Sequence, residues 1–115
     1  MNALRNKVQL IGRLGDKVEI KTLESGKIVG RVSIATQEVY RNAQGEKITD
    51  TTWTNLVVWG KQAETLEKYT DKGSEVAIEG KLANRAYTDK NGDKKYISEV
   101  VISDFLLLGG KEKQD

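Results

Sequence analysis

The sequence predicts an all-β fold with one short helix, closed into a small barrel that carries long hairpins. Most of the 115 residues lie in runs in which polar and apolar side chains alternate, which is typical of half-buried strands. Turn signals rich in glycine and asparagine separate these runs. A single segment, residues 61–72, has helical periodicity instead. At this length the default is one domain.

The first half of the chain supplies the predicted strands before the helix. The first strand covers residues 7–14, and Gly12 inside it marks a bend. The chain resumes as strand over residues 18–22 after a short turn. The next strand covers residues 28–36 and continues towards Tyr40, because apolar side chains recur at every second position.

The third long strand is expected at residues 51–59, and the helix at residues 61–72 follows it. Gly73 is placed to cap the C-terminal end of this helix, where a left-handed residue is favoured. The buried face of the helix is expected to hold Ala63, Leu66, Tyr69 and Thr70.

The last strands are predicted at residues 75–82, 85–88 and 96–108. The Asn91-Gly92 pair between them is the strongest short hairpin signal in the sequence. The remaining residues, 109–115, are polar, and we expect them to be disordered.

The order strand, strand, strand, helix, strand, strand is that of the OB-fold, a five-stranded Greek-key barrel. Closure into a barrel removes the exposed edges that such long apolar strands would otherwise present. Glycines inside strands, Gly12, Gly30 and Gly80, are expected at its bends. We therefore predict one OB-fold domain over residues 1–108, followed by the polar end.

Composition excludes most common enzyme designs. The chain contains no Cys and no His, which removes thiolate and imidazole metal sites and the usual catalytic triads and dyads. We expect no catalytic residue, metal or cofactor. The acidic residues that lie on the predicted strands are interpreted as solvated surface charge: Glu75, Glu79, Glu99 and Asp104.

Charge and hydropathy leave the partner open. The net charge of +2 is too close to neutral to indicate nucleic acid without a sorted surface. No run of 18 apolar residues predicts a membrane span, and we expect no secretory signal at the start of the chain.

Trp53 and Trp59 are six residues apart on one predicted strand, so they share a face with Asn55 and Val57. Two indoles would crowd the inside of a small barrel, so we favour an outward placement over the alternative, a core placement. The opposite face, which we expect to line the barrel, carries Thr52, Thr54, Leu56 and Val58.

An outward pair of indoles calls for a partner, either a protein or nucleobases that stack on the rings. Tyr69 and Phe105 are instead interpreted as core residues. Basic side chains next to aromatic ones favour nucleobases, because cations neutralise phosphates while rings stack bases: Arg41 after Tyr40, Lys61 after Trp59, and Arg85 before Tyr87.

Five stretches, in this order and spacing, make the sequence resemble the bacterial single-stranded DNA-binding protein family over about residues 1–110. They are residues 6–15, 32–36, 52–61, 72–82 and 87–92. The resemblance implies an OB-fold that coats single-stranded DNA with little sequence preference. It also implies a homotetramer that supports replication, recombination and repair in the bacterial cytoplasm, at the nucleoid.

The family's stacking aromatics correspond to Tyr40, Trp53, Trp59 and Tyr87. Asn55 stands where the family often has a basic residue, and Thr54 stands where many members have His near the subunit contacts. The candidate phosphate and polar contacts are Lys7, Arg31, Arg41, Asn55, Lys61, Lys72 and Arg85.

Family members usually continue into a long linker that ends in an acidic tip and recruits replication and repair enzymes. The present sequence ends at Asp115 without such a tip, so we do not expect recruitment of these proteins through a tail. Two alternatives remain open: an OB-fold accessory factor that binds RNA or replication-restart proteins, and an OB-fold enzyme, which the lack of His and Cys disfavours.

Overall fold

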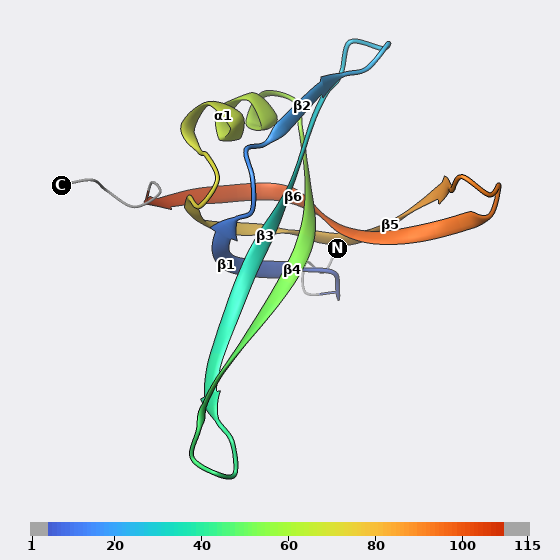
Figure 1. Cartoon of the computed structure of the whole chain (residues 1–115). Helices are drawn as coiled ribbons and strands as arrows, with labels where there is room; N and C mark the ends of the chain where they lie inside the picture. Colours follow the sequence, from blue (N-terminus) through green and yellow to red (C-terminus); the bar gives the residue numbers. More distant parts are fainter. Residues whose placement is uncertain (1–4, 110–115) are drawn as a thin grey trace.

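The computed structural model describes residues 5–109 and contains six strands and one helix (Figure 1). The predicted polar end at 110–115 lies outside the described residues, and Gly109 is the last residue of a strand rather than part of that end. In chain order the elements are β1 (Val8–Leu14), β2 (Glu19–Thr22), β3 (Ile28–Arg41), β4 (Lys47–Trp59), α1 (Lys61–Tyr69), β5 (Glu75–Thr88) and β6 (Lys94–Gly109).

The strands form one closed sheet in the order β1-β5-β6-β4-β3-β2, and β1 also pairs with β3. Leu14 of β1 pairs with Ile34, and Glu19 of β2 pairs with Arg31 further along the same strand. Since β1 and β2 line the same edge of β3, they act as one interrupted strand of a five-stranded barrel. The predicted fold class is confirmed.

Two of the glycines that were expected at bends mark places where strands approach closely. A Cβ atom at Gly12 would lie 2.1 Å from the carbonyl oxygen of Ala35, and one at Gly80 would lie 2.1 Å from that of Val101. The pairing register of β5 and β6 shifts between Glu79 and Gly80, as at a β-bulge. Only glycine fits at these two points of the barrel wall.

The inner face of the barrel is apolar and follows the predicted alternation at Leu56 and Val58, whereas Thr52, which was expected to line the barrel, is exposed. Leu56 and Val58 are 1% and 0% exposed, whereas Trp53 and Trp59 on the same strand are 60% and 42% exposed. Phe105 is partly buried against this core. The buried cluster consists of Leu14, Val18, Val32, Ile34, Leu56, Val58, Ala63, Leu66, Val76, Ile78, Val100 and Ile102.

The helix is shorter than predicted, and one residue of its face was assigned wrongly. Ala63, Leu66 and Thr70 are buried, but Tyr69 is 60% exposed. At 100° per residue Tyr69 lies about 120° away from Ala63, which turns its ring off the barrel. The helix is capped at Thr70, so Gly73 is not the C-cap but a left-handed residue of the next turn, with φ of 90°.

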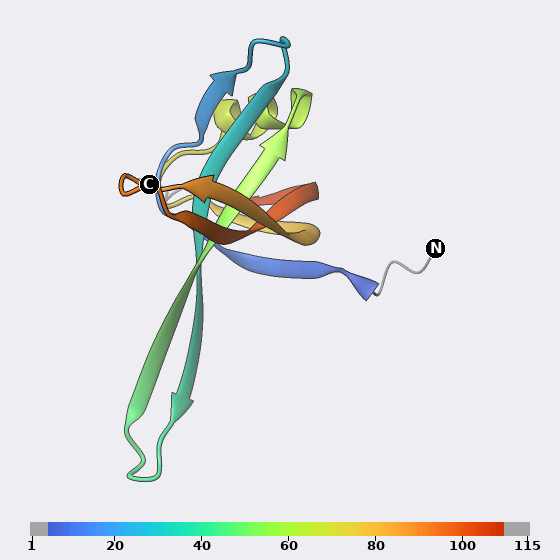
Figure 2. The ribbon, with the colours of Figure 1, turned by 90° about the vertical axis from the view of Figure 1, so that its right-hand side faces the viewer.

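Two long hairpins leave the barrel in different directions (Figures 1 and 2). The pairing of β3 with β4 runs without interruption from Val29 opposite Trp59 to Arg41 opposite Lys47. The β5–β6 pair continues to Thr88 opposite Lys94. The two separate runs predicted within residues 75–88 are therefore one strand.

Candidate nucleic-acid interface

Trp53, Asn55, Val57 and Trp59 alternate along β4 on the side away from the barrel core, and we call this side the outer face. The Cα atoms of the two tryptophans are about 20 Å apart along the strand, at 3.3 Å per residue. Ser33 of β3 pairs with Asn55, and Arg31 and Val101 flank Val57 on its two neighbouring strands. Val57 is nevertheless only 2% exposed, so the outer face has an apolar floor between its exposed groups.

The Trp53 ring lies against the loop that joins β1 to β2. A Cβ atom at Gly15 would be 2.5 Å from Cζ3 of Trp53 and 2.7 Å from Oγ of Ser33. The amide of Gly15 donates a hydrogen bond to the carbonyl oxygen of Ser33 at 2.9 Å, which fixes the loop against β3. The absence of a side chain at Gly15 therefore allows the indole to rest on the loop while the rest of the ring is exposed.

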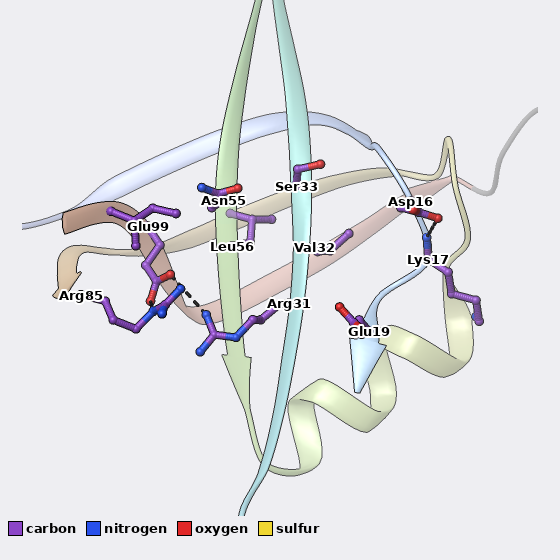
Figure 3. Close-up of a pocket in the computed structure, with 11 residues that line it drawn as sticks. Asp16, Lys17, Glu19, Arg31, Val32, Ser33, Asn55, Leu56, Arg85 and Glu99 are labelled. Atoms are coloured by element: carbon purple, nitrogen blue, oxygen red, sulfur yellow. Dashed lines mark hydrogen bonds and ion pairs between the residues drawn. The ribbon is translucent and has the colours of Figure 1, made fainter. Parts of the chain in front are cut away.

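A cluster of three charged side chains occupies the centre of the outer face. Nη1 of Arg31 is 3.3 Å from Oε1 of Glu99, and Nε of Arg85 is 3.4 Å from Oε2 of the same carboxylate. Figure 3 shows the Glu99 carboxylate next to both guanidinium groups. The Glu99 side chain is 8% exposed, whereas the arginine side chains are 40% and 42% exposed. The cluster itself holds two cations and one anion, and Lys17, Asp16 and Glu19 lie around it, so the lining as a whole has no net formal charge.

These groups line an open cavity of about 590 Å³ on the outer face (Figure 3). Three predicted contacts, Arg31, Asn55 and Arg85, lie together in its wall. Lys17 also lines the cavity, but its ammonium group donates to the carbonyl oxygens of Glu67 and Thr70 at 2.8 and 3.1 Å. Tertiary structure thus joins candidates that are distant in the sequence.

Tyr87 continues this surface along the β5–β6 hairpin. It lies two residues beyond Arg85, so both side chains share one face of β5. Its ring is exposed, and the residue opposite it on β6 is Lys95. Glu99 contacts both Arg85 and Arg31, and Arg31 lies beside Val57 of β4. The face of β5 that carries Arg85 and Tyr87 is therefore next to the outer face of β4.

Tyr40 and Arg41 lie at the far end of the β3–β4 hairpin. Tyr40 pairs with Ile48, whereas the β3 residue opposite Trp53 is Ala35. Tyr40 follows Ala35 by an odd number of positions, so the exposed Tyr40 ring is on the opposite face of the ribbon from Trp53. Nη1 of Arg41 donates to the carbonyl oxygen of Gly45 at 2.8 Å within the hairpin loop. The structure does not bring this pair into the cavity.

The three predicted lysines also lie apart from the cavity. Lys7 is 3.8 Å from a carboxylate oxygen of Glu79 in an exposed ion pair. Lys61 is the exposed first residue of α1, two positions after Trp59. Lys72 is exposed in the turn after α1.

Sequence reasoning missed Glu99 on this surface and the exposed ring of Tyr96 on the opposite face of the β5–β6 hairpin. Glu99 is predicted from the sequence to be a solvated charge, but it is a buried partner of two arginines. Local sequence patterns do not predict contacts with residues 68 and 14 positions away. Tyr96 is 68% exposed on β6, and Nζ of Lys94 lies 5.9 Å from its ring centroid. Because Tyr96 pairs with Ala86, its ring is on the opposite face of the hairpin from Tyr87. Lys94 and Lys95 directly precede Tyr96. A basic residue within two positions of an aromatic one is the pattern that marked Tyr87 as a candidate, and it could have identified Tyr96.

The outer face thus offers exposed aromatic rings, guanidinium groups and an amide side by side. Rings stack on bases of any identity, and guanidinium groups bind phosphate oxygens. Within residues 5–109 no group of three or more His, Cys, Asp or Glu side chains is placed to hold a metal ion. No helix in the same part of the chain is long and apolar enough to cross a membrane.

Comparison with known proteins gives one consistent result. Residues 5–108 match the model of the Single-strand binding protein family. The chain is 42% identical over 108 residues to Single-stranded DNA-binding protein 1 of Chlorobaculum tepidum, which covers 93% of this chain and 67% of that protein. It is also similar to a solved structure of the Plasmodium falciparum SSB complex with ssDNA, with a TM-score of 0.80, 34% identity, and coverage of 90% of this chain and 94% of that one.

Proposed function

The chain belongs to the single-strand binding protein family, and on that premise we propose that it binds and coats single-stranded DNA with little sequence preference, in support of replication, recombination and repair. The family consists of non-enzymatic DNA-binding proteins. The protein would act where single-stranded DNA is exposed, which in a bacterium is the cytoplasmic nucleoid.

The observation that carries this proposal is the outer face itself. Two indoles that are 60% and 42% exposed flank a half-exposed arginine pair on one surface of the barrel. Exposed indoles cost free energy in water, and stacking on unpaired bases removes that cost without reading their identity. Duplex DNA hides its base faces, so this surface favours single strands.

We propose that the bases stack on Tyr40, Trp53, Trp59 and Tyr87. The last three rings share strand faces with residues of the cavity: Trp53 and Trp59 with Asn55, and Tyr87 with Arg85. A bound DNA strand that also reaches Tyr40 must pass around the edge of the β3–β4 hairpin, because the Tyr40 ring lies on the face of the hairpin opposite to Trp53. The proposed phosphate and polar contacts are Arg31, Asn55 and Arg85 in the cavity, with Lys7, Arg41, Lys61 and Lys72 around it.

We further propose that the chain forms a homotetramer. An apolar stripe crosses three strands on the side of the barrel formed by β1, β5 and β6, where Ile11 pairs with Ala77 and Ala77 pairs with Leu106. Ile11 and Leu106 are 54% and 63% exposed. Burial of this stripe between copies of the chain would remove it from water.

A titration with poly(dT), followed by intrinsic fluorescence, tests the binding proposal. Stacking on Trp53 and Trp59 should quench their emission, and affinity should fall as salt rises because phosphate contacts release counterions. Competition with poly(rU) of equal length separates a DNA-binding protein from an RNA-binding accessory factor. Unchanged emission at saturating poly(dT) would contradict the stacking assignment.

A further inference from the structure

Glu99 is the buried carboxylate of the cavity on the outer face. Removing a carboxylate from water is costly unless it is paired and hydrogen-bonded. Here the pairing is double: Oε1 faces Nη1 of Arg31 at 3.3 Å, and Oε2 faces Nε of Arg85 at 3.4 Å. One carboxylate therefore holds both arginines of the cavity.

Each arginine is left with most of its hydrogen-bonding capacity. A guanidinium group carries five N–H donors, and each of these two uses one of its nitrogens for Glu99. Across residues 5–109 neither guanidinium has another protein partner. Both side chains are about 40% exposed and line the same cavity, so their remaining donors are accessible from solvent.

The backbone alone would not place these two groups together. Arg31 is on β3 and Arg85 is on β5, and the sheet order puts β4 and β6 between those two strands. Two guanidinium groups also repel each other at short range. Glu99, on the intervening strand β6, supplies both the attraction and the fixed geometry that bring them to one place (Figure 3).

We propose that Glu99 is a positioning residue that holds Arg31 and Arg85 side by side, so that their free N–H groups form one shared site for a phosphate of the bound DNA strand. This inference rests on the proposed function and assigns an internal acidic residue to it. Glu99 itself does not touch the DNA, since the arginines cover its carboxylate. It raises affinity by preorganising its two neighbours, although its own charge repels phosphate.

The central test is Glu99→Gln, which keeps the side-chain volume but removes the charge that attracts both arginines. Binding of a dT oligonucleotide should weaken about tenfold, the scale of one lost charge-assisted hydrogen bond. The matched control is Glu67→Gln, which removes the same charge from an exposed ion pair with Lys17 at 3.7 Å and should bind as the wild type does. Thermal unfolding of each variant reports whether it is folded.

A double-mutant cycle separates positioning from a general structural role. Arg31→Gln should itself weaken binding, and Glu99→Gln should add little in that background, because no arginine pair remains to be held. Equal losses in both backgrounds would overturn the proposal. Tighter binding by Glu99→Gln would overturn it too, since Glu99 would then compete with phosphate for the arginines.

Arg31→Lys provides a test that does not depend on how Glu99→Gln folds. Lysine keeps the positive charge but lacks the planar fork that can engage the carboxylate and a phosphate at once. Binding should weaken about tenfold with an unchanged salt dependence. Wild-type affinity for Arg31→Lys would overturn the proposal. Failure of the wild-type protein to bind dT would instead refute the proposed function, so the two failures are distinguishable.

Discussion

Gly15 and Trp53 are in such close contact that a methyl group on Gly15 would lie 2.5 Å from the Cζ3 atom of the indole. The loop after β1 thereby sets the position of an aromatic ring on β4, although 38 positions separate the two residues in the sequence. The atom that would be displaced belongs to the far end of a side chain, not to the backbone. A substitution at Gly15 should therefore move the ring and leave the barrel intact.

Gly15→Ala should weaken binding of dT oligonucleotides by about 1–3 kcal/mol, which is the contribution of one stacked base. The added methyl group would displace the Trp53 ring from its position against the loop. In a Trp59→Phe background Trp53 is the only tryptophan, so its emission spectrum reports the displacement directly. Gly109→Ala is the control, since no atom lies within 4 Å of its added Cβ. An unshifted spectrum together with normal affinity would show that Gly15 does not position the ring.

Trp53→Ala and Trp59→Ala should each weaken single-stranded DNA binding by about 1–3 kcal/mol through the loss of a stacking platform. Tyr69→Ala removes an equally exposed ring on α1, outside the proposed path, and should leave the affinity unchanged. Equilibrium titration with labelled dT measures all three. If the Tyr69 variant loses as much affinity as the tryptophan variants, the outer face is not the specific site.

Lys61→Gln should reduce the steepness with which binding falls as salt rises. For single strands each lost phosphate contact lowers the slope of log K against log salt concentration by about 0.7. Lys27→Gln, at the turn before β3, loses the same charge away from the proposed contacts and should keep the wild-type slope. Equal slopes for the two variants would remove Lys61 from the contact set.

Gly80→Ala should destabilise the barrel by about 1–3 kcal/mol, because the new methyl group would clash with the backbone carbonyl of Val101. Relieving the clash requires a shift of the β5 or β6 backbone. Urea unfolding measures the change, with Gly109→Ala again as the control on β6. Unchanged stability would mean that the β5–β6 bulge can relax around a side chain.

Ile11→Lys should dissociate the proposed tetramer, because it places a charge at the β1 end of the apolar stripe that β1, β5 and β6 present. The molar mass in solution, measured by sedimentation, should fall while the circular dichroism spectrum is kept. Ile20→Lys on β2 is the matched control. An unchanged mass for Ile11→Lys would place the subunit contact elsewhere.

Alternation along β4 correctly predicted that Leu56 and Val58 face the core, but not that Thr52, expected on the same face, is exposed in the β3–β4 hairpin. Leu56 and Val58 are buried and both tryptophans are exposed, because side chains of a strand alternate strictly between its two faces. The same local reasoning failed at Tyr69. At the last turn of the helix, apolar character and approximate spacing did not establish whether the barrel surface reaches that far.

Local sequence thus determined the strands, their turns and the outward indoles, since these follow from the periodicity of neighbouring residues, and the order of these elements along the chain predicted the barrel. Only the tertiary structure decided that Glu99 joins Arg31 to Arg85, that Gly15 supports Trp53, and that Tyr40 lies on the other side of its hairpin. These relationships join residues on different strands. They depend on strand order, register and twist, which the closing of the barrel fixes and no single stretch of sequence encodes.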